Sequence, residues 1–155
     1  MAYELLKLAH VLGAIVLLGT GGGIAFFMVM AHRTRDARHV AMTAGTVVVA
    51  DTVFTATAVV AQPLTGAALA WNAGWPLTEP WILASLALYV VAGLFWLPVV
   101  WMQLRMRDLA REAARTGDTL PAGYDRLYRL WFVCGFPGFG AVVAILWLMI
   151  AKPSW

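Results

Sequence analysis

Only a few side chains within the apolar stretches of this chain can carry chemistry. They are His10, Asp51, Gln62 and Gln103, together with hydroxyl groups. A polar or ionisable residue in lipid is costly, and it usually faces the interior of a helix bundle. These four side chains are therefore the candidates for a functional site.

His10 is the only histidine inside these stretches, and it lies about two turns into the first helix. Gly13 shares its helix face and is expected to leave a shallow slot beside the imidazole, while Gln62 enters from the second stretch at similar depth. A neutral imidazole is a natural axial ligand for haem iron. Equally, the ring could simply hydrogen-bond a carbonyl or Gln62. Because one histidine forms no metal site by spacing, both hypotheses stay open.

Asp51 lies deeper in the second stretch, with Thr52 and Thr55 as neighbours. An intramembrane carboxylate is a candidate proton relay. It could also serve structure, by bonding those hydroxyls or by reaching Gln103 across the bundle. The residues alone favour neither role.

The remaining polar features indicate packing or solvation. His32 and His39 flank a cluster of arginines, and we expect both rings to be solvated. The single cysteine, Cys134, excludes an internal disulfide. Gly19 and Gly23 form a small-xxx-small pair, which predicts a close approach of another helix or of a flat cofactor.

The composition requires a solvent other than water, since 62% of the residues are hydrophobic and 12% are charged. A soluble domain has about 25% charged residues. The first apolar run is too long for the core of a cleavable signal peptide, so we expect a true membrane span there. A bilayer-crossing helix needs about 20 apolar residues. The sequence meets this length in four spans: 3–31, 40–70, 81–104 and 127–151.

The predicted fold is therefore all-α, a four-transmembrane-helix bundle that forms one domain over residues 1–155. The third helix is expected to continue past the membrane until Gly117 and Pro121 stop it. Nine of the eleven lysines and arginines fall in or beside the first and third connections, and the second connection has none. The positive-inside rule then predicts that both termini lie outside the cytoplasm. The same arginines flank apolar runs and form no basic face with interleaved aromatics, so no nucleic-acid partner is expected.

Five stretches carry a resemblance to a known family: residues 6–14, 50–54, 62–66, 96–103 and 148–153. Through them, almost the whole chain resembles a bacterial family of predicted four-helix integral membrane proteins of unknown function. The resemblance implies the fold and a location in the bacterial inner membrane, with no established activity.

A second, more distant resemblance rests on short motifs: Lys7, His10 and Gly13, a threonine-rich run at 55–57 before Gly66 and Leu69, Trp81, Pro137, and Lys152-Pro153. In these the chain is similar to the HemJ-type haem-containing protoporphyrinogen oxidases. This resemblance implies that His10 is a haem ligand. Other polar residues of that family are replaced here by Leu83, Ser85, Phe95-Trp96 and Cys134-Gly135, which argues against the same oxidation.

The leading hypothesis is a protein that binds haem b and serves electron transfer or redox sensing. His10 would be the axial ligand, and Gly13 and Gln62 would line the cofactor site. The alternatives are a cofactor-free scaffold or accessory subunit and a small transporter that uses Asp51. Whether the chain is an enzyme stays open. Its expected partners are the lipid bilayer and either a second copy or a membrane redox partner.

Overall fold

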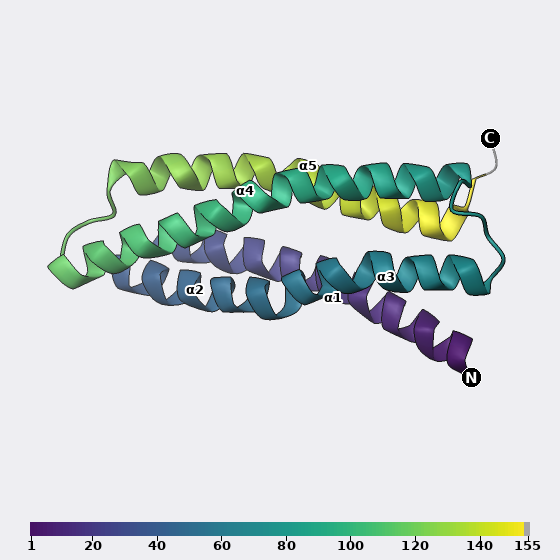
Figure 1. Cartoon of the computed structure of the whole chain (residues 1–155). Helices are drawn as coiled ribbons and strands as arrows, with labels where there is room; N and C mark the ends of the chain where they lie inside the picture. Colours follow the sequence, from purple (N-terminus) through teal and green to yellow (C-terminus); the bar gives the residue numbers. More distant parts are fainter. Residues whose placement is uncertain (154–155) are drawn as a thin grey trace.

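The computed structural model of the chain describes residues 1–153, which form helices joined by short connections (Figure 1). In chain order the elements are α1 (Ala2–Thr34), α2 (Ala37–Ala50), the π-helical turn η1 (Asp51–Thr55), α3 (Ala56–Asn72), α4 (Pro80–Thr116) and α5 (Ala122–Ala151). Because α2, η1 and α3 follow one another without a break, they form one rod, Ala37–Asn72. Among the described residues there are thus four rods, each long and apolar enough to cross a membrane. The predicted all-α fold with four membrane-spanning helices is confirmed.

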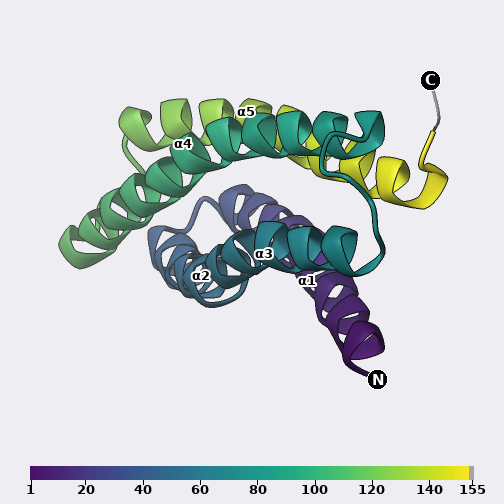
Figure 2. The same cartoon turned by 45° about the vertical axis from the view of Figure 1, so that its right-hand side comes forward.

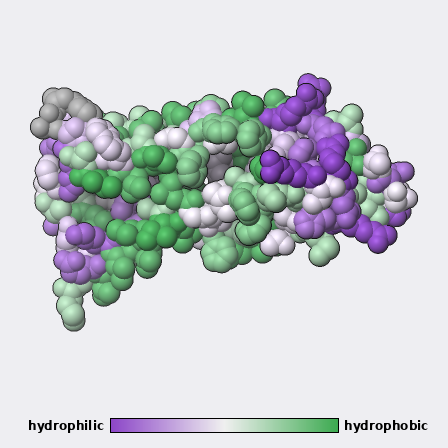
Figure 3. All heavy atoms as spheres, turned by 180° about the vertical axis from the view of Figure 1, so that it is seen from behind, coloured by the Kyte–Doolittle hydropathy of each residue, from purple (hydrophilic) through white to green (hydrophobic). Residues whose placement is uncertain are grey.

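The rods lie side by side and define two ends of the molecule (Figure 1). The terminal end holds the N-terminus, the α3–α4 connection and the end of α5. The arginine-rich end holds the α1–α2 and α4–α5 connections. On the face shown in Figure 3, hydrophobic residues cover the middle and hydrophilic residues gather toward both ends. Many large apolar side chains along the rods are exposed, which is the surface expected of a protein surrounded by lipid.

The helices extend beyond the predicted spans at the arginine-rich end. The longest extension is that of α4, which continues from the predicted limit at residue 104 to Thr116. Gly117 then adopts a left-handed conformation with φ 78°, which glycine accepts without steric cost, and the helix stops. The predicted continuation of this helix and its end at Gly117 are confirmed.

The most deeply buried side chains form a core toward the arginine-rich end, where α1, α2, α4 and α5 meet. Its largest fully buried members include Met28, Val40, Met106 and Tyr124. At the terminal end the buried cluster is smaller, with Trp81 as its largest residue. Figures 1 and 2 both show the N-terminal part of α1 diverging from α5, while α4 and α5 stay paired. The bundle is therefore tightest at the arginine-rich end and more open toward the termini.

The small residues of α1 do not serve the close helix packing that the sequence predicted. A Cβ atom built on Gly19 or Gly23 would meet no atom within 4 Å. Instead these glycines line a groove of about 330 Å³ whose opposite wall includes Val47, Ala50 and Phe54. This smooth face of α1 therefore borders a groove, and no other helix of the described chain packs directly on these glycines.

An ion pair connects two helices at the arginine-rich end. Arg35, in the turn between α1 and α2, donates to both carboxylate oxygens of Asp125 near the start of α5, at 2.5 and 2.9 Å. The hydrogen bond from Arg35 holds the pKa of the Asp125 carboxyl below its usual value. Both residues lie outside the predicted spans 3–31 and 127–151. The pair thus joins the first and last rods at the surface.

Candidate functional site

His10 lies on α1, and its imidazole is turned toward α3. Its Nδ1 is 2.8 Å from the Oγ1 atom of Thr65. The Thr65 hydroxyl donates its own proton along its helix, to the carbonyl oxygens of Ala61 at 2.8 Å and of Gln62 at 3.2 Å. A hydroxyl has one proton, so when Thr65 donates to one of these carbonyls it accepts from His10, and the proton of the neutral ring is then on Nδ1.

The second ring nitrogen of His10 then carries a free lone pair. His10 Nε2 makes no hydrogen bond to residues 1–153, and it is not among the polar atoms that the protein encloses completely. A metal-binding histidine normally has this arrangement, with one nitrogen held by a protein acceptor and the other free for the metal.

Gln62 and two glycines fix the contact between α1 and α3 around this ring. Gln62 Nε2 donates to the backbone carbonyl of His10 at 2.7 Å. A Cβ atom on Gly13 would lie only 2.2 Å from that amide nitrogen, and one on Gly66 would lie 3.1 Å from His10 Cε1. The slot expected over Gly13 is therefore filled by the Gln62 side chain. Gln62 is near His10 as predicted, but it bonds the backbone, while the ring bonds Thr65.

Pro63 shapes the same interface from within α3. Proline has no N–H, so it cannot pair with the carbonyl of Val59 one turn earlier. The hydroxyl of Tyr89, on α4, donates to that carbonyl instead. The carbonyl that Pro63 leaves without a helical partner is therefore paired across the α3–α4 interface.

Asp51 opens the π-helical turn η1 and is 5% exposed. Its carboxylate accepts a long hydrogen bond from Trp96 Nε1 of α4, at 3.4 Å. With its amide nitrogen facing the carboxylate, Gln103 donates to Asp51 at 3.1 Å and accepts from Trp131 Nε1 of α5 at 3.3 Å. The contact predicted between Asp51 and Gln103 across the bundle is therefore present.

Among residues 1–153 the Asp51 carboxyl group has no cationic partner, since no ion pair there includes it. Its donors are two neutral side chains of α4, those of Trp96 and Gln103. Asp51 lies 11 residues before Gln62 on the same rod, which corresponds to about 16 Å along a helix. The structure thus contains two separate polar centres, one around His10 and one around Asp51.

His32 differs from its predicted solvated state. Its ring stacks on Tyr128 with centroids 3.6 Å apart, and its Nδ1 is buried without a partner among the described residues. His39 is exposed, as predicted. The reason for the difference is that α1 continues past the predicted span to Thr34, which brings His32 against the start of α5.

Several functional neighbours were missed by the sequence analysis: Thr65, Tyr89, Trp96 and Trp131. Each donates or accepts through a single polar atom on a side chain that also packs as an apolar body. Each of these residues carries a polar atom at the same membrane depth as His10 or Asp51. A hydropathy pattern does not identify such residues, because it treats the whole side chain as apolar. In the described part of the chain, no three residues of His, Cys, Asp and Glu converge as ligands for a free metal ion.

Comparison with known proteins agrees with this architecture. A family model described as "Predicted integral membrane protein (DUF2269)" matches residues 4–153. No curated protein matches the chain. No solved structure matches it either. Since the family model covers nearly the whole sequence, the chain belongs to the DUF2269 family of predicted integral membrane proteins.

Proposed function

We propose that the protein binds haem b through Nε2 of His10 and serves electron transfer or redox sensing in the membrane. The observation that carries this proposal is the hydrogen bond from His10 Nδ1 to Thr65. It supports the tautomer in which Nε2 holds the lone pair that an axial ligand needs. The residues present therefore fit the group as a single-histidine site. A bound haem would supply one-electron chemistry.

The other residues of this centre act through His10. Thr65 holds the ring and raises the basicity of Nε2. Gln62 and Gly13 hold the backbone of His10 against α3, and in this proposal they position the ligand. His32 and His39 lie near the opposite end of the molecule, so a second axial ligand from the described chain would be a weaker donor than histidine.

The absorption spectrum tests this proposal. Wild-type protein from haem-replete cells should show a Soret band, and His10→Ala should lose it while remaining folded and inserted in the membrane. His39→Ala is the matched control, because His39 is exposed at the other end and should leave the band unchanged. An unchanged spectrum in His10→Ala would show that His10 is not the ligand. A wild-type protein without the band would favour the cofactor-free scaffold.

The second candidate function is proton carriage by Asp51, in a small transporter. Its support is a buried carboxyl group with neutral donors and no cation among the described residues, in a π-helical turn. Such turns are frequent at functional sites. Asp51→Asn keeps the shape but removes the exchangeable acid. Proteoliposomes containing wild-type protein should then conduct protons faster than those containing Asp51→Asn, and equal rates would exclude this function.

We also propose the orientation and the location. The concentration of arginine at one end supports a cytoplasmic arginine-rich end with both termini outside. The resemblance to a bacterial family supports the bacterial inner membrane. A second copy of the chain or a membrane redox protein would be the electron-exchange partner.

A further inference from the structure

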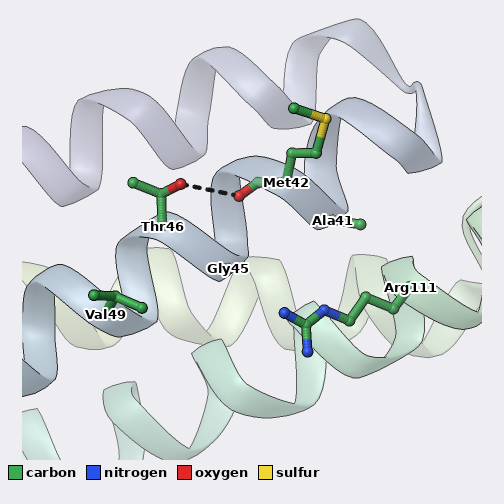
Figure 4. A pocket seen from close by; sticks show the side chains of 6 residues that line it. All are labelled: Ala41, Met42, Gly45, Thr46, Val49 and Arg111. Carbon is green, nitrogen blue, oxygen red and sulfur yellow. Dashed lines mark hydrogen bonds between the residues drawn. The ribbon is translucent and has the colours of Figure 1, made fainter.

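A groove between α2 and α4 at the arginine-rich end belongs to neither polar centre. It encloses about 570 Å³ and is lined by Ala41, Met42, Gly45, Thr46, Val49 and Arg111 (Figure 4). All but Arg111 come from α2, and apart from the Thr46 hydroxyl their side chains are apolar. The Thr46 hydroxyl is already used, since it donates to the carbonyl of Met42 at 3.2 Å. Arg111 is therefore the one free polar side chain of the lining.

The Arg111 side chain extends toward the membrane. Side chains of an α-helix lean toward its N-terminus, which for α4 is the terminal end of the molecule. Figure 4 shows the guanidinium reaching from its backbone toward Gly45. A Cβ atom on Gly45 would lie 3.4 Å from Arg111 Nη2, so the guanidinium lies close to α2 at this glycine. Gly45 is inside the predicted span 40–70, near its start, where headgroups meet hydrocarbon.

Arg111 also lacks a counter-ion within residues 1–153. The acidic neighbours on its own helix are engaged elsewhere, Asp108 by Arg107 at 2.8 Å and Glu112 by Arg115 at 2.6 Å. No ion pair in the described chain includes Arg111. A cation beside an apolar groove at the depth of the headgroups is suited to an amphipathic ligand, with an anionic group and an apolar chain.

We propose that this groove binds one anionic phospholipid. Its phosphate is held by the guanidinium of Arg111, whose planar fork matches phosphate oxygens. One acyl chain lies along Met42 and Val49, which are 74% and 61% exposed and so meet the bilayer directly. A free phosphate ion would use Arg111 alone and leave this apolar wall uncovered. The lipid therefore fits both parts of the groove.

The test measures lipid retention by the full-length protein in detergent, by native mass spectrometry with added phosphatidylglycerol or phosphatidylcholine. Wild type should retain phosphatidylglycerol preferentially, and Arg111→Gln should bind it about tenfold more weakly. Arg105→Gln is the matched control, because Arg105 is an exposed arginine on the same helix that does not line the groove. It should bind as wild type does.

A second variant distinguishes the contribution of the groove to lipid binding from that of the Arg111 charge. Gly45→Leu keeps Arg111 but fills the space beside it, and it should cause a similar loss. Equal losses in Arg105→Gln and Arg111→Gln would indicate diffuse attraction and overturn the site. Equal retention of phosphatidylcholine, or displacement of the lipid by millimolar inorganic phosphate, would overturn the assignment to an anionic lipid.

Discussion

The bond from Tyr89 to Val59 allows a quantitative prediction about how α4 is fastened to α3. Pro63 deprives the Val59 carbonyl of its helical N–H partner, and the Tyr89 hydroxyl takes that place. Tyr89→Phe keeps the ring but removes the donor. The carbonyl is then left without a partner in an apolar surrounding.

The expected cost follows from what the carbonyl loses. An orphaned buried acceptor costs about 1–3 kcal/mol in soluble proteins. Hydrogen bonds between membrane helices average about 0.6 kcal/mol and reach about 1.7 kcal/mol. Because the Val59 carbonyl has no other donor within its helix, we expect Tyr89→Phe to lower the free energy of unfolding by about 1 kcal/mol. Replacing Pro63 by alanine restores an N–H one turn after Val59, so in that background Tyr89→Phe should cost little.

The measurement is a double-mutant cycle. The free energy of reversible unfolding in mixed micelles is measured for wild type, for both single variants and for the double variant. The coupling between the positions should be about 1 kcal/mol, in the sense that Pro63→Ala rescues Tyr89→Phe. Tyr3→Phe is the control, since the Tyr3 side chain forms no hydrogen bond with any of residues 1–153. A cost for Tyr89→Phe that is the same with and without Pro63 would refute the reasoning.

Three further predictions concern other parts of the molecule. Asp51→Leu should destabilise the bundle by about 1–3 kcal/mol, because Trp96 loses its buried acceptor. A variant with the same free energy of unfolding as wild type would argue against an interior Asp51. A cysteine at Thr78 should react with an impermeant thiol reagent from the periplasmic side, and reaction from the cytoplasmic side alone would invert the proposed topology. The pair of Arg35 and Asp125 should stabilise the protein by no more than about 1 kcal/mol, since both side chains are partly exposed to solvent. Because the folded-state pKa of Asp125 is lowered, this stabilisation is fully present above the unfolded-state pKa of about 3.9 and is lost as the pH falls through the folded-state value. Asp125→Asn should therefore lower the free energy of unfolding at pH 7, and its effect should shrink as the pH falls below about 3.9.

The sequence predicted the features that depend on depth and length. Four apolar runs fixed four spans, and depth alone placed Gln62 near His10 and Gln103 near Asp51. Gly117 predicted the end of α4 because glycine adopts, at little steric cost, the left-handed backbone conformation that commonly ends a helix.

What depends on helix rotation could not be predicted. Thr65 meets the His10 ring only because α1 and α3 face each other in one register, and a rotation by one residue would offer Leu64 or Gly66 in its place. The π-helical turn at Asp51 shifts the faces of the following rod, and no residue type in 51–55 requires it. Gly19 and Gly23 show the converse, since a pattern that permits close packing does not supply a helix to pack.

The central claim, that His10 Nε2 binds haem iron while Thr65 holds Nδ1, is tested most directly by the resonance Raman spectrum of the reduced, haem-loaded protein. Wild-type protein should show an iron–histidine stretching band that is absent in His10→Ala. In Thr65→Val the band should move to lower frequency, because the imidazole loses the acceptor that strengthens it as a ligand. Failure of the wild-type protein to take up haem, or a band that persists unchanged in His10→Ala, would contradict the claim.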